Sequence, residues 1–139
     1  INNPLFRSEL FKDKKLREKV NAGIHPLVWK ALVRKIGSLP GSPGMISVLA
    51  EVPLLYEAGW GSRFDEVIVI YAGRESCRNR LAGRDTVSGF QAERELSAQM
   101  PLWEKCMLAD HVVNNSGAWS LAVLELLHLG EILWPGKRG

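Results

Sequence analysis

Cysteine and long apolar runs are scarce in this sequence. Its 139 residues contain two cysteines, Cys77 and Cys106, which lie far apart and outside any CxxC pattern. Neither a zinc site nor a disulfide framework is therefore indicated. No apolar stretch approaches the roughly 18 residues of a membrane-spanning helix, and the first residues lack the apolar core of a signal peptide. We expect a soluble cytoplasmic protein with no membrane partner.

The sequence also has little excess of one charge over the other. The formal net charge is +3, and basic residues are mixed with acidic ones in stretches such as residues 12–19. This mixture is typical of a solvated helix face, although individual arginines can still bind a phosphate-bearing small molecule. No basic stripe with interleaved aromatic residues occurs, so we do not expect a nucleic-acid partner.

Short apolar runs rich in β-branched residues alternate with segments of helical periodicity. Runs that are apolar on both faces are typical of strands buried in a parallel sheet between layers of helices. We therefore predict an α/β fold in which helices flank a parallel sheet. Pro26 would start one helix and Ser88 would cap another. The predicted strands are residues 45–52, 67–72 and 111–113, and the predicted helices lie within residues 5–20, 26–37, 74–84, 89–107 and 119–134.

Four arginines recur on one predicted helix. Residues 74 and 78, and likewise 80 and 84, are one helical turn apart, so the helix presents two cationic faces. A solvated surface helix explains this pattern. A phosphate clamp is the alternative, because a guanidinium group offers planar paired donors to phosphoryl oxygens. The spacing leaves both interpretations open for Arg74, Arg78, Arg80 and Arg84.

Polar residues follow two of the predicted strands, at the edge where open α/β sheets bind ligands. Asn115 and the backbone beside Gly117 can read the edge of a base, or they can form an ordinary turn. Glu57, after the first predicted strand, can contact a substrate or lie exposed on a helix. His25, just before Pro26, can contact a ligand phosphate or cap the following helix.

These residues lie in blocks that resemble the dephospho-coenzyme A kinase family, a branch of the P-loop nucleoside-monophosphate-kinase-like proteins. The blocks occur in the family's order and spacing along nearly the whole chain. They are residues 24–28 (IHPLV), 52–57 (VPLLYE), 64–70 (FDEVIVI), 80–85 (RLAGRD), 97–105 (SAQMPLWEK) and 109–117 (ADHVVNNSG).

The resemblance implies a three-layer P-loop-kinase-like fold and a specific reaction. In that reaction the γ-phosphoryl group of ATP is transferred, with Mg²⁺, to the ribose 3′-hydroxyl of dephospho-coenzyme A, the last step of coenzyme A synthesis. By position, residues 1–44 would be a helical region on the acceptor side, 45–85 part of the α/β core, 86–107 a helical lid over ATP, and 108–139 the last strand and C-terminal helix of the core.

The resemblance also implies roles for individual residues. Arg84 and Arg80 would be the cations that act on the phosphates. Asn115 and Gly117 would lie against the adenine of ATP, and His25 and Glu57 would lie near the acceptor. It assigns no metal ligand within this chain. A small departure is Cys77, where family members commonly carry glutamine.

A larger departure is an absence. Family members begin with a strand and a GxxGxGKS/T-type loop, and this sequence contains no such loop. Phosphoryl transfer depends on groups that cradle the β- and γ-phosphates. We therefore expect these residues to be part of a longer polypeptide and to be inactive alone. In the family's sheet, the missing first strand would lie between the strands predicted at residues 45–52 and 67–72. The alternative is a non-catalytic nucleotide-binding, coenzyme A-binding or interaction module derived from a P-loop kinase.

Overall fold

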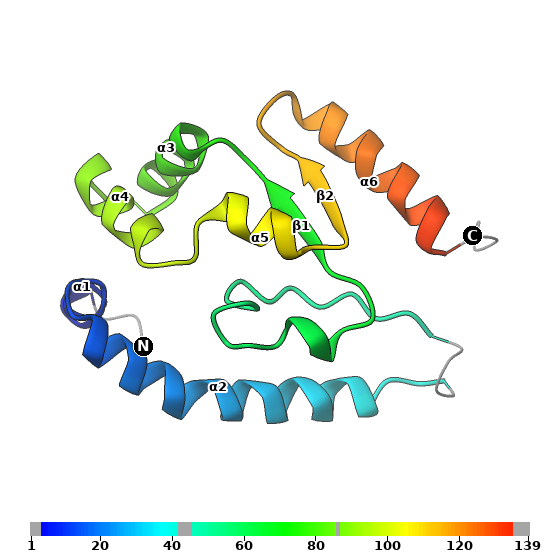
Figure 1. Ribbon diagram of the computed structural model, residues 1–139, viewed down its shortest axis with the longest axis horizontal. Helices are drawn as coiled ribbons and strands as arrows, with labels where there is room; N and C mark the ends of the chain where they lie inside the picture. Colours follow the sequence, from blue (N-terminus) through cyan, green and yellow to red (C-terminus); the bar gives the residue numbers. More distant parts are fainter. Residues whose placement is uncertain (1–3, 42–45, 86, 135–139) are drawn as a thin grey trace. The chain divides into compact units, whose positions relative to one another are not determined.

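The computed structural model describes residues 4–41, 46–85 and 87–134. The chain divides into two compact units, Ile1–Gly59 and Trp60–Gly139 (Figure 1). The described part of the first unit is built on helices, and the second unit holds a small parallel sheet with helices around it. Within the described ranges, no helix combines the length and the apolarity that crossing a lipid bilayer requires.

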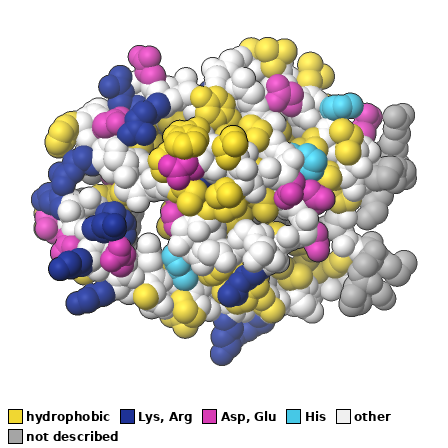
Figure 2. Space-filling model, viewed as in Figure 1, with side chains coloured by type: hydrophobic (Ala, Val, Ile, Leu, Met, Phe, Trp, Pro, Cys, Tyr) yellow, Lys and Arg dark blue, Asp and Glu magenta, His cyan; other side chains and the backbone are white. Residues whose placement is uncertain are grey.

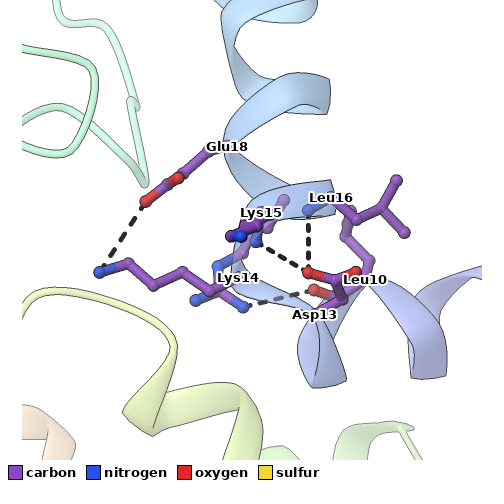
Figure 3. A network of polar contacts seen from close by, with 7 residues as sticks. Leu10, Asp13, Lys14, Lys15, Leu16 and Glu18 are labelled. Atoms are coloured by element: carbon purple, nitrogen blue, oxygen red, sulfur yellow. Dashed lines mark hydrogen bonds and ion pairs between the residues drawn. The ribbon is translucent and has the colours of Figure 1, made fainter.

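The first unit contains helix α1 (Pro4–Lys12) and the long helix α2 (Lys14–Gly37), which meet at Asp13. One carboxylate oxygen of Asp13 accepts hydrogen bonds from the backbone N–H groups of Lys15 at 2.8 Å and Leu16 at 3.1 Å (Figure 3). An aspartate in this position stabilises a helix because the first amides of a helix have no partner within it. The Arg17 guanidinium then donates to the carbonyl oxygen of Leu10 at 3.3 Å and so ties α2 to the end of α1.

Helix α2 differs from the prediction at its start and agrees at its end. The predicted start at Pro26 was wrong, because α2 begins at Lys14 and continues through Pro26. Asp13 supplies the N-terminal cap upstream, and an established helix can extend through a proline at the loss of one backbone hydrogen bond. The end at Gly37 was predicted correctly.

Residues 46–52 do not form the strand that was predicted for residues 45–52; residue 45 lies outside the described residues. In the described part of the chain the sheet is two-stranded and does not include this segment. A strand persists only where its N–H and C=O groups bond to a neighbouring strand, and β propensity supplies no such neighbour. As a result Ile46, Val48 and Leu49 are exposed. Hydrogen-bonded turns follow over residues 53–59.

The second unit contains two parallel strands, β1 (Ile68–Tyr71) and β2 (His111–Asn114), as predicted. Ile68 is aligned with His111, and Tyr71 with Asn114. A short 3₁₀ helix, η1 (Gly61–Arg63), precedes β1. At the other end of the ladder, the backbone N–H of Asn115 donates to the carbonyl oxygen of Tyr71 at 2.7 Å.

The described residues of the second unit also form four helices: α3 (Arg74–Asp85), α4 (Gly89–Ser97), α5 (Leu102–Leu108) and α6 (Trp119–Leu133). Ser88 caps α4, as predicted, and its hydroxyl accepts from the N–H of Gln91 at 3.2 Å. The single helix predicted over residues 89–107 was wrong, because the chain leaves the helix after Ser97 and restarts after Pro101. Proline has no N–H to donate and disfavours helical geometry in the residue before it.

The core of the second unit forms where α6 packs on β2. Val113 is 2% exposed and clusters with Ala122 and Leu129 of α6, with Ile68 and Leu133 against them. Val69 is buried as well, and α5 contacts β1. The protein is therefore an α/β protein with a parallel sheet, which confirms the predicted fold class. Part of α6 stays uncovered, since Leu121, Leu124 and Leu127 are exposed, and hydrophobic side chains reach the surface in Figure 2.

Candidate functional site

The carboxyl ends of β1 and β2 lie at one edge of the sheet, and two loop segments are bonded together there. The chain leaves β1 through Ala72 and Gly73 into α3, and it leaves β2 through a turn at residues 115–117. The N–H of Gly73 donates to the Ser116 hydroxyl at 3.1 Å. Within the turn, the N–H of Ser116 donates to the side-chain oxygen of Asn114 at 2.9 Å. These bonds give the ligand-binding edge of an open α/β sheet a defined shape.

Two of the residues singled out in the sequence meet at this edge. The Nη2 atom of Arg80, on α3, donates to the backbone carbonyl oxygen of Asn115 at 2.9 Å, across 35 residues of sequence. A guanidinium group has five N–H donors, so one hydrogen bond leaves donors for an anion. Arg80 is exposed and has room to make such contacts. The structure thus places a cation beside the turn that was predicted to face the adenine.

Arg84 lies one helical turn further along α3 and is held by its neighbour. Its Nε and Nη2 atoms pair with the two carboxylate oxygens of Asp85 at 2.8 and 3.2 Å. The Arg84 side chain is 73% exposed, whereas Asp85 is 14% exposed. The paired geometry is the one that a guanidinium also uses with phosphate. An anion at Arg84 would therefore compete with Asp85 for the same donors.

Gly117 is not required by the local packing. An added Cβ atom would meet no heavy atom within 4 Å, and the backbone is not in the left-handed region. Nothing in the described structure therefore demands glycine here. The open space beside Gly117 is compatible with the predicted ligand.

His25 and Glu57, the predicted acceptor-side residues, both belong to the first unit. His25 lies inside α2, so the alternative that it caps a helix was wrong, because Asp13 is the cap. Glu57 lies in the turns of residues 53–59 and not on a regular helix. The Nε2 atom of His25 and one carboxylate oxygen of Glu57 are shielded from solvent. Such burial limits the positions that each polar group can adopt.

The sequence interpretation missed the polar groups that lie between β2 and α6. An open groove of about 350 Å³ between β2 and α6 is lined by residues that include Glu125 and His128. Glu125 accepts a hydrogen bond from the backbone N–H of Asn114 at 2.7 Å, and His111 lies 3.2 Å from a Glu66 carboxylate oxygen. Glu125 therefore supports the strand that leads into the candidate site. In the sequence these groups appeared only as a few polar residues, among them Glu125 and His128, on a largely apolar helix.

The cysteines and the metal-ligating residues give no further site. Both cysteines are free thiols, and burial raises the pKa of the Cys106 thiol above its ordinary value. A thiol with a raised pKa is a poor nucleophile at neutral pH. Among the described residues, no three His, Cys, Asp or Glu side chains are grouped so that they could hold a metal ion.

Fold and site together define an α/β protein whose candidate ligand site is at the carboxyl edge of a parallel sheet, beside an arginine-bearing helix. A family model described as dephospho-CoA kinase matches residues 1–120. The chain belongs to the dephospho-CoA kinase family, as its sequence blocks indicated.

Individual relatives agree with this membership. The chain is 37% identical over 111 residues to a dephospho-CoA kinase of Anaeromyxobacter dehalogenans, a match that covers 80% of this chain and 52% of the relative. It is 29% identical over 139 residues to a dephospho-CoA kinase of Syntrophotalea carbinolica, and this match covers 100% of this chain and 65% of the relative. Among solved structures, the crystal structure of TT1252 from Thermus thermophilus is similar, with a TM-score of 0.73 and 26% identity, covering 95% of this chain and 67% of that one. The chain thus spans about half to two thirds of these relatives.

Proposed function

We propose that this chain supplies the acceptor, adenine and lid parts of a dephospho-coenzyme A kinase. The reaction transfers the γ-phosphoryl group of ATP to the ribose 3′-hydroxyl of dephospho-coenzyme A. Membership of the family supports the proposal. The observation that carries it is the hydrogen bond from Arg80 to Asn115, which puts a cation and a polar turn together at the ligand-binding edge of the sheet.

In this proposal the two arginines of α3 act on the phosphates of ATP. Phosphoryl transfer is catalysed mainly by positioning and by neutralising the charge on the transferred group. Arg80 is anchored on the turn and directs its remaining donors to the nucleotide. Arg84 exchanges its pair with Asp85 for phosphate oxygens once ATP is bound. Asn115 and Gly117 lie against the adenine.

The acceptor would contact the first unit, and the lid would lie in the second. His25, on α2, and Glu57, in the turns of residues 53–59, are proposed to contact dephospho-coenzyme A because their positions match the acceptor side of the family. The proposal divides the chain into four regions. Residues 1–44 form the acceptor side, residues 45–85 and 108–139 belong to the α/β core, and residues 86–107 form the lid. Residues 86–107 are the lid that excludes water from the phosphates.

Magnesium is proposed to enter with ATP. The described residues present no group of three side chains that could hold a metal. Mg²⁺ keeps several waters and is commonly bound by substrate phosphates with one or two carboxylates, so this arrangement fits it. We propose a cytoplasmic protein that acts on small molecules only. On the face shown in Figure 2, Lys and Arg side chains lie among Asp and Glu side chains.

The 139-residue chain is proposed to be inactive alone, because its sequence contains no GxxGxGKS/T-type loop. A coupled assay with ATP and dephospho-coenzyme A tests the function on the full product of the gene. Turnover is the expected result, and turnover of a nucleoside monophosphate instead would place the protein in a neighbouring kinase class. An intact mass of the native protein near 15.5 kDa would contradict the proposal of a longer polypeptide.

The absent loop also favours a second candidate, a module that binds without catalysis. Calorimetric titration with dephospho-coenzyme A separates the two candidates. Binding by the full gene product without any phosphoryl transfer would support the module. Binding followed by turnover would support the kinase.

A further inference from the structure

Arg74, the first residue of α3, reaches across to α4. Its Nε and Nη2 atoms both contact the Glu93 carboxylate oxygen Oε1, at 2.9 and 2.5 Å, and Nη2 also donates to the Ser97 hydroxyl at 2.8 Å. We name this set of contacts between Arg74, Glu93 and Ser97 the Arg74 latch. It is independent of the contacts of Arg80 and Arg84, although all three arginines share one helix.

The latch closes the open end of a helical hairpin. Helix α3 ends at Asp85 and α4 begins at Gly89, so a short connection joins them, and the two helices pack against each other (Figure 1). Arg74 is at the end of α3 remote from that connection, and Ser97 is the last residue of α4. A contact at the open end restrains α4 most effectively, because the connection already holds the other end.

The two sides of the latch differ in how firmly they are held. Gly73, immediately before Arg74, is bonded through its N–H to Ser116, so Arg74 starts from the edge of the sheet. Helix α4 buries Ala92 completely, yet Phe90 is 74% exposed, and the chain leaves the helix before Pro101. The sheet is therefore the fixed side, and α4 is the side that the latch restrains.

We propose that Arg74 is a positioning residue that holds α4 against α3 and so keeps the lid in the arrangement that binds ATP. The inference rests on the proposed function, in which residues 86–107 are the lid. When the binding-competent arrangement is only partly populated, the apparent affinity for the ligand falls by that fraction. Loss of the latch thus weakens ATP binding without touching the reacting atoms.

The magnitude is modest because the pair is exposed. The side chains of Arg74 and Glu93 are 58% and 42% exposed, and pairs of this kind shift a local equilibrium by about two- to five-fold. Arg74→Ala should raise the amide exchange rate of residues 91–97 by about that factor. Arg74→Glu should raise it further, since a carboxylate would then face Glu93.

Hydrogen exchange followed by mass spectrometry on the full gene product tests the latch directly. The charge-swapped double variant Arg74→Glu/Glu93→Arg should return the exchange of α4 to within about two-fold of wild type, because the opposite charges face each other again. Arg78→Glu is the matched control: it makes the same charge change one turn along α3, and Arg78 forms no ion pair with any described residue.

Two results would overturn the proposal. One is unchanged exchange in α4 after Arg74→Glu. The other is loss of protection in β1 and β2 together with α4, which would make Arg74 a general stabilising residue. The kinase assay adds a separate readout, an ATP KM raised about two- to five-fold with kcat within two-fold. Wild-type protein without kinase activity would reject the proposed function, while the exchange experiment would still decide the latch.

Discussion

Replacing Arg80 by alanine removes the contact that joins α3 to the turn after β2. The guanidinium donates to the Asn115 carbonyl at 2.9 Å, and a hydrogen bond from a charged donor contributes about 1.5–3 kcal/mol when it is shielded. Arg80 is exposed, so solvent reduces that contribution to about 1 kcal/mol. We expect ATP to bind about five-fold more weakly from loss of the anchored turn, and weaker still from loss of the cation.

Calorimetric titration of the full gene product with ATP measures this change. Arg80→Lys keeps the charge but loses the planar donors, so its affinity should lie between those of wild type and Arg80→Ala. Arg34→Ala is the matched control, since it removes one exposed basic side chain from the last turn of α2. An Arg80→Ala protein that binds ATP as tightly as the Arg34→Ala protein would refute the role of Arg80.

Three further predictions concern the fold. Asp13→Ala removes the N-terminal cap of α2 and should destabilise the first unit by about 1 kcal/mol. On heating, the helical circular dichroism signal should then be lost at a lower temperature than in the wild type. Asp65→Ala, which removes an exposed aspartate outside the helices, is the control and should have little effect. Val113→Ala leaves a cavity in the core cluster and should lower the free energy of unfolding by about 1.5–3 kcal/mol in urea titrations; an unchanged midpoint would contradict the packing of α6 on β2. Because burial raises the pKa of the Cys106 thiol above its ordinary value, its alkylation should accelerate at a higher pH than that of a free thiol, and the stabilisation of the folded protein by the neutral thiol should be lost over the same alkaline range; rapid alkylation at neutral pH would be the contrary result.

The elements that the sequence predicted well are those with a local cause. Helices α3 and α6 and strands β1 and β2 were identified from periodicity and composition, and the cap at Ser88 from capping chemistry. Each of these signals acts within a few residues of the chain. Pro101 was a local signal too, and giving it full weight would have separated α4 from α5.

The elements that were predicted wrongly depend on a pairing strand or on a stronger helix-start signal elsewhere in the chain. Residues 46–52 have the composition of a strand, but pairing decides whether a strand forms, and none of the described strands pairs with them. Pro26 has the chemistry of a helix start, but Asp13 starts that helix first. Composition gives a segment a preference, and the surrounding structure decides whether the preference is realised.

The sequence by itself determined the family and the α/β class, because ordered sequence blocks and apolar periodicity are properties of the chain. The tertiary structure alone decided what Arg74 and Arg80 contact, whereas Arg84 pairs with its neighbour in the sequence. Periodicity groups Arg74 with Arg78 and Arg80 with Arg84, yet Arg74 binds α4, Arg80 binds the turn at Asn115, and Arg84 binds Asp85. Helical spacing specifies which side chains share a face. Only the packing of α4 against α3, and the position of the turn after β2, specify what Arg74 and Arg80 contact.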